Sequence, residues 1–217
     1  MGLARIVSEH GDIAVEVLPD RVAAEFDGLP LASTMDDDSI KLLQAAFELL
    51  RSVESLGETV FTLVKNLHVL ESDKGMDVSF SSPGVPFTIF VSVPHPDERY
   101  AVIRLVEGIV HEAMHLQLSL IENGCALVTG SEHSAYSPWK QRDRPVQGVL
   151  HGIYVFAVIL QALDELADRA PEFRAYSTKR RSEILDELGD MDPLEDGLTS
   201  NGVAFHRHLM SAVAGDA

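Results

Sequence analysis

The feature that most constrains the fold of this sequence is a long apolar segment, predicted to be helical from about Glu98 to Asn123 and to end at Gly124. Apolar residues cover most of its circumference, which is typical of a buried helix. The polar exceptions follow one another at spacings of three and four, so they share one face. They are Arg104, Gly108, His111, His115, Ser119 and Glu122. A single polar stripe therefore crosses an otherwise buried helix, and both of its histidines lie on it.

The flanking segments predict a mixed fold. Residues 3–26 alternate loosely between apolar and polar, which suggests short strands. Asp36-Asp37-Asp38 reads as the N-terminal cap of a helical run over 39–70 that is broken near Gly57. Residues 76–93 alternate around the turn Ser81-Ser82-Pro83-Gly84 and predict a hairpin, and Asp97 is a plausible cap for the helix that follows. Residues 129–145 read as a loop.

A second buried helix is predicted from about Pro145 to Arg169, and a short closing helix over 203–213. We therefore expect an α+β, mostly helical fold in one domain over 1–217. Its parts are an N-terminal region of strands, helix and hairpin (1–97), two long helices with their connecting loop (98–170) and a C-terminal helical segment (171–217). The order of elements predicts a zincin-like arrangement, in which a small sheet precedes the helix with the polar stripe and a second long helix follows it.

Composition excludes several classes of function. The chain of 217 residues has a formal net charge of −17, which argues against binding nucleic acid or anionic lipid because both need a basic face. The single cysteine, Cys125, cannot form a disulfide within the chain, so a reducing cytoplasm is the simpler expectation. The longest apolar run, 149–163, contains a histidine and is predicted to be a buried helix rather than a membrane span.

The stripe carries His111-Glu112-Ala113-Met114-His115, an H-E-x-x-H pattern. Two residues four apart lie on one helix face about 6 Å apart, so both imidazoles can reach one metal ion. Glu112 can then take a proton from metal-bound water or hold a supporting hydrogen bond. Two buried histidines without partners would be costly, which favours a metal over an inert core.

A metal site needs a third protein ligand, and four residues are candidates: His151, Glu132, His133 and Glu122. We favour His151, near the start of the second buried helix. Gly148 and Gly152 on either side of it would let that helix approach the first one closely. Imidazole suits both zinc and iron, so these residues leave the metal open.

The segment between the two helices is expected to pass near the metal. It carries Trp139, the only tryptophan, and Tyr136, both candidates for substrate contact. It also carries Arg142 and Arg144 in a strongly acidic protein. Arginine binds carboxylates bidentately, so either residue could hold a carboxylate-bearing co-substrate.

Three segments together resemble the HExxH-motif proteins of peptide natural-product clusters, which are described as 2-oxoglutarate-dependent peptide β-hydroxylases. They are 105–115 with the motif, Ser137-Pro138-Trp139 with Arg142 and Arg144-Pro145, and Gly148 to Phe156 with His151. The resemblance covers about residues 85–157 and extends to the closing segment, Leu198 to Leu209.

The resemblance implies Fe(II) held by His111, His115 and His151. It also implies O2 and 2-oxoglutarate as co-substrates, with Arg142 or Arg144 on the far carboxylate of the oxoacid. The substrate would be a ribosomally made precursor peptide hydroxylated at a side-chain β-carbon, and Glu112 would support the metal site without necessarily acting as a base. The predicted strand Phe87–Val93 would be an edge that pairs with the peptide.

Two other functions remain open. A zinc metallopeptidase would use Glu112 to activate zinc-bound water and would not need the arginines. A non-catalytic module would use the metal only to hold two helices together, with four protein ligands and no open position.

Overall fold

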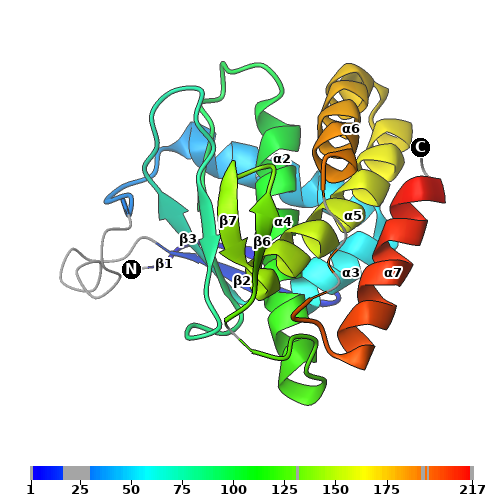
Figure 1. The fold of residues 1–217 in the computed structure, drawn as a ribbon. Coiled ribbons are helices and arrows are strands. Elements are labelled where there is room, and N and C mark those ends of the chain that lie inside the picture. Colours follow the sequence, from blue (N-terminus) through cyan, green and yellow to red (C-terminus); the bar gives the residue numbers. More distant parts are fainter. Residues whose placement is uncertain (1, 17–29, 131, 192–193, 195, 216–217) are drawn as a thin grey trace.

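A mixed β-sheet lies against a group of long helices (Figure 1). The computed structural model describes residues 2–16, 30–130, 132–191, 194 and 196–215. Within them the main sheet has the order β1-β2-β3-β5-β4, with β2, β3 and β5 parallel and the outer strands β1 and β4 antiparallel to their neighbours. The strands are β1 (Gly2–Ser8), β2 (Gly11–Glu16), β3 (Asn66–Leu70), β4 (Ser79–Ser81) and β5 (Thr88–Ser92). The predicted α+β, mostly helical class is confirmed, while the predicted strand residues 17–26 lie outside the described residues.

Two predictions about the sheet are wrong. Residues 66–70 were expected to continue a helix but form β3, whose side chains are almost all buried. A central parallel strand is a continuous apolar run, so its sequence lacks the alternation that distinguishes a strand from a buried helix. Phe87–Val93 was expected to be an edge, yet β5 lies between β3 and β4. The hairpin over 76–93 is confirmed, and its first strand, β4, is the edge.

The helices largely follow the predicted segments. They are α2 (Asp37–Ser52), α3 (Glu54–Leu63), α4 (Ala101–Gly124), α5 (Val146–Arg169), α6 (Arg174–Gly189) and α7 (Ser200–Gly215). The cap is confirmed, because Asp36 accepts a 2.8 Å hydrogen bond from the backbone N–H of Ser39. The first helical run breaks at Val53 rather than at Gly57, which is buried inside α3 close to the backbone of α2.

Helix α4 is central and mostly buried, as predicted, and it contacts α2, α3, α5, β4 and β5. Its beginning differs from the prediction. Asp97 does not cap it; the preceding residue is Tyr100, in the left-handed region at φ 63°, and no side chain caps the helix. Helix α4 is therefore stabilised by packing on several sides rather than by a capping side chain at its beginning.

Residues 134–145 form a second, two-stranded sheet where a loop was predicted. Strands β6 (Ser134–Ser137) and β7 (Arg142–Pro145) pair antiparallel and contact α5 (Figure 1). Serine, arginine and proline give these strands no apolar alternation, so their pairing could not be read from periodicity. The hairpin brings residues 138–141 over the beginning of α5.

Helix α5 is long and apolar enough to cross a membrane, but 72% of its most apolar window is buried inside the protein. It is therefore packed as a core helix, which is consistent with a soluble protein. The predicted buried helix from about Pro145 to Arg169 is confirmed.

Candidate metal centre and its cavity

The polar stripe of α4 forms the floor of a cavity of about 630 Å³. His111, His115 and Ser119 contribute from α4, and His151 comes from the first turns of α5. Residues of β4, of the β6–β7 hairpin and of α6 line the rest. Four separate parts of the chain therefore meet the two histidines of the motif.

Three imidazole rings follow one another in this floor. The Nε2 atoms of His111 and His115 are 3.2 Å apart, and the Nδ1 atoms of His115 and His151 are also 3.2 Å apart. Nε2 of His151 lies 3.0 Å from a carboxylate oxygen of Glu122, which also accepts a 2.7 Å hydrogen bond from Gln147. Glu122 therefore orients His151 and leaves the Nδ1 atom of that ring facing the other histidines.

The pair His111 and His115 fits a metal ion. Two imidazole nitrogens that bind one ion at about 2.1 Å lie ~3.0–3.4 Å apart. His151 faces the other nitrogen of His115, so its ring must turn before it can reach an ion between the first two. Within the described residues no group of three His, Cys, Asp or Glu side chains is arranged to hold an ion. The donors fit in type and proximity, and the rotamer of the third differs from a closed three-ligand site.

Burial keeps His111 and His115 neutral. It lowers the pKa of His111 to about 4, aided by the charges of Lys140 and Arg180. It lowers the pKa of His115 to about 3, aided by His111 and His151. A neutral imidazole is the form that binds metal, so the histidines are ready to coordinate well below neutral pH.

Glu112 is buried and its carboxylate is occupied. Its two oxygens accept 2.6 Å hydrogen bonds, one from the hydroxyl of Ser79 and one from that of Ser81. Burial raises the pKa of Glu112, while the two serines oppose that rise. The edge strand β4 is thereby tied to the motif helix, and the carboxylate has less freedom to take a proton from water.

The wall opposite α6 is cationic. Lys140 and Arg144, both from the β6–β7 hairpin, line the cavity. Both lie close enough to His115 to lower its pKa. Neither side chain forms an ion pair with a carboxylate among the described residues. Arg142 is exposed and does not line the cavity, so of the two predicted arginines only Arg144 faces the histidines.

The glycines of α5 have a different role from the one predicted. A Cβ at Gly152 would overlap the indole of Trp139, and a Cβ at Gly148 would lie 3.3 Å from the guanidinium of Arg144. They admit side chains of the hairpin, not the backbone of α4. Trp139 also packs edge-on against Phe156, with ring centroids 5.3 Å apart, and lines the cavity.

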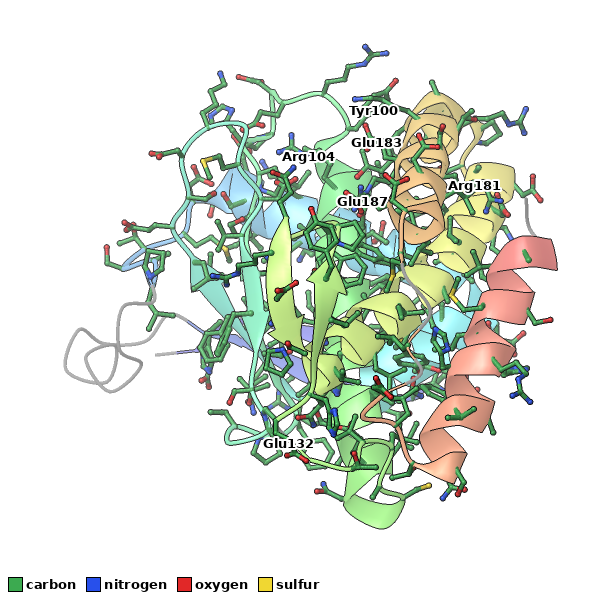
Figure 2. All side chains as sticks on the ribbon, viewed as in Figure 1. Tyr100, Arg104, Glu132, Arg181, Glu183 and Glu187 are labelled. Atoms are coloured by element: carbon green, nitrogen blue, oxygen red, sulfur yellow. The ribbon has the colours of Figure 1, made fainter. Side chains whose placement is uncertain are left out.

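Other predicted residues lie elsewhere. Tyr136 is 46% exposed and does not line the cavity, so a substrate contact there is not supported by the geometry. Glu132 is exposed near the end of α4 that is remote from Arg104 (Figure 2) and pairs at 3.5 Å with His133, which packs against Gly197. Neither residue is placed to be a third ligand.

A second cavity of about 690 Å³ continues the first along α4. The two share Ser79, His111 and Arg180, so together they form one cleft. One wall of both is a face of α6 whose members are spaced by three and four, and Figure 2 labels two of them, Glu183 and Glu187. The members of this face are Tyr176, Arg180, Glu183 and Glu187.

Sequence reasoning missed this wall, as well as Lys140 and the two serines that bind Glu112. The helical spacing in α6 and the i, i+2 spacing of Ser79 and Ser81 were the available signals. Neither shows which neighbour the face meets.

No family model matches the chain, and no curated protein matches it. What defines the class is the structure itself, an α+β protein with a cleft whose floor carries three adjoining histidines.

Proposed function

We propose that this protein is an Fe(II)- and 2-oxoglutarate-dependent oxygenase that hydroxylates a side-chain β-carbon of a ribosomally made peptide. The observation that carries the proposal is that the three histidines line the same cavity as Lys140 and Arg144, two cations that have no ion-pair partner among the described residues. In that reaction the oxoacid and O2 become succinate and carbon dioxide, and the second oxygen atom enters the peptide as a hydroxyl.

His111, His115 and His151 would hold the metal, with His151 oriented by Glu122. Bound there, Fe(II) would supply the activation of O2. The fold supports a zincin-like arrangement, since a small sheet with an antiparallel edge strand, β4, precedes the motif helix and α5 carries the third histidine.

Arg144 and Lys140 would bind the far carboxylate of the oxoacid. Such an anion would meet the unpaired guanidinium in a partly buried cavity, where a charge-assisted hydrogen bond is stronger than at the surface. Helix α5 leaves room for that guanidinium at Gly148.

The shape of the cleft suits a peptide. Its floor runs from Arg104 to Ser119 on α4, about 22 Å at the rise of an α-helix. An extended peptide covers that length with roughly six or seven residues. The free edge of β4, rather than the interior strand β5, is where such a peptide would add to the sheet.

The zinc peptidase remains the competing function, favoured by the raised pKa of Glu112. The hydrogen bonds from Ser79 and Ser81 weigh against it, because they stabilise the charged carboxylate and so make it a weaker base towards water. Glu112→Gln should abolish peptide cleavage in a peptidase. In the proposed oxygenase it should leave hydroxylation within about tenfold of the wild type.

The test is anaerobic visible absorption of the Fe(II)-loaded protein during titration with 2-oxoglutarate. We expect a new saturable band, with half-saturation raised about tenfold or more in Arg144→Gln. Arg142→Gln is the matched control, two residues away on the same strand but outside the cavity, and should titrate like the wild type. A featureless titration, or equal effects of the two substitutions, would contradict the proposal.

A further inference from the structure

Glu187 on α6 is a carboxylate without a matching donor. It lines the metal cavity, and its Oε2 atom is buried and has no hydrogen-bond partner among the described residues. A buried carboxylate oxygen left without a donor is destabilising, so Glu187 requires a donor from outside the described residues, either an ordered water or a ligand.

The cation whose charge acts on Glu187 is already engaged. Arg180, two helical turns earlier, donates a 2.7 Å hydrogen bond to Glu107 and also lies 3.5 Å from Glu183. Its guanidinium lies over the ring of Phe156 as well. Arg180 therefore acts on Glu187 through its positive charge but donates no hydrogen bond to it. Burial raises the pKa of Glu187, against the influence of Arg180, which agrees with a carboxylate short of partners.

The charged side chains on the two walls of the cavity therefore require opposite kinds of ligand group. The β6–β7 hairpin presents Lys140 and Arg144 without carboxylates, and α6 presents Glu187 without a donor. An anionic ligand satisfies the first wall and leaves the second. A group that carries N–H or O–H donors satisfies the second, and one that also carries a positive charge satisfies it best.

We propose that Glu187 recognises a cationic side chain of the peptide, a lysine or arginine, at the residue that lies over the histidines. The assignment of the hairpin wall to the oxoacid rests on the proposed function; the donor requirement of Glu187 does not. The net charge of −17 is in keeping, because an acidic protein attracts a cationic peptide over distances beyond contact.

The only tryptophan of the chain provides the test. Trp139 lines the same cavity, so its fluorescence reports what enters there. The metal-free protein is titrated with the blocked pentapeptide acetyl-Ala-Ala-Lys-Ala-Ala-amide. The same peptide with norleucine or glutamate at its centre is titrated in parallel.

We expect a saturable change with the lysine peptide, at least tenfold weaker with the norleucine peptide and absent with the glutamate peptide. Glu187→Gln keeps the shape of the side chain and should weaken the lysine peptide about tenfold, so that it binds no better than the norleucine peptide. Glu183→Gln removes the same charge from the same helix but lines only the second cavity, so it should change the affinity less than twofold.

Equal effects of the two substitutions, no preference for lysine, or no saturable change in the wild type would each overturn the inference. Circular dichroism and thermal unfolding establish that both variants fold. Titration of the same proteins with 2-oxoglutarate separates the two proposals. If the Fe(II)-loaded wild type does not bind the oxoacid but the lysine peptide still depends on Glu187, the proposed function fails and the cationic subsite stands.

Discussion

The two ends of the cleft share one helix floor but differ in how their charges are matched. Around the second cavity Arg104 donates to Asp77 at 2.7 and 2.8 Å and to Glu98 at 2.8 Å. Glu107 likewise accepts from Arg180 at 2.7 Å and from Tyr176 at 2.6 Å. Around the first cavity, which holds the three histidines, Lys140, Arg144 and Glu187 have no such partners within the described part of the chain.

This difference indicates that one end of the polar stripe stabilises the fold and the other end binds a ligand. The paired end joins elements distant in sequence: Arg104 ties the segment before β4 to α4, and Arg180 ties α6 to α4. Paired charges satisfy one another, so they leave little for a ligand. Unpaired charges in a partly buried cavity cost stability unless something binds them. The end of the cleft that holds the histidines therefore has the character of a binding site. The end around Arg104 and Glu107 stabilises the fold that supports it.

The largest effect is expected on metal binding. His115→Ala removes the ring that contacts both other histidines and should weaken Fe(II) or Zn(II) binding at least ~100-fold. Metal titration with a competing chelator measures it. His95→Ala removes an exposed histidine that lines neither cavity, and should bind metal like the wild type. Equal affinities of all three proteins would show that the histidine end is not a metal site.

The next effect tests the paired end directly. Arg104→Met leaves Glu98 and Asp77 without their cation, and Glu98 is largely buried. We expect the free energy of unfolding in urea to fall by about 2–3 kcal/mol. Arg144→Met, the same change at the unpaired end, should alter it by less than ~0.5 kcal/mol. Similar losses from both substitutions would erase the distinction between the two ends.

The histidine end should also make stability depend on pH. The folded pKa values of about 4 for His111 and about 3 for His115 lie below the unfolded value of 6.5. Between these values the unfolded chain binds more protons, so stability is complete above pH 6.5 and falls as the pH drops towards about 3.

We therefore expect the free energy of unfolding of the metal-free protein to fall steadily between pH 6.5 and 4. Urea unfolding at a series of pH values measures the loss. The double variant His111→Ala, His115→Ala should show a correspondingly flatter profile over that interval. A profile with the wild-type slope would show that the two rings are not buried as neutral groups.

The smallest effect concerns the floor between the two ends. Gly108 lies within α4, and a Cβ there would meet nothing within 4 Å. Gly108→Ala should therefore raise the free energy of unfolding by about 0.5–1 kcal/mol through helix propensity alone. Gly152→Ala is the contrasting change, because its Cβ would overlap Trp139, and it should destabilise the protein. A loss of stability in Gly108→Ala would mean that the floor is more closely covered than the cleft suggests.

The sequence by itself determined the local features of this protein. The helix over 98–123, its polar stripe and the H-E-x-x-H spacing follow from a 3.6-residue period that is written into one continuous segment. The cap at Asp36 and the hairpin over 76–93 are equally local, since each depends on residues a few positions apart.

Only the tertiary structure decided which residues meet. It made β4 rather than β5 the edge, turned residues 134–145 into a hairpin, and chose Arg144 over Arg142 for the cavity. It also brought α6, with Glu187, against the histidines. Each of these depends on contacts between segments far apart in sequence. Periodicity shows that a segment has a polar or an apolar face, but the partner of that face is set by packing.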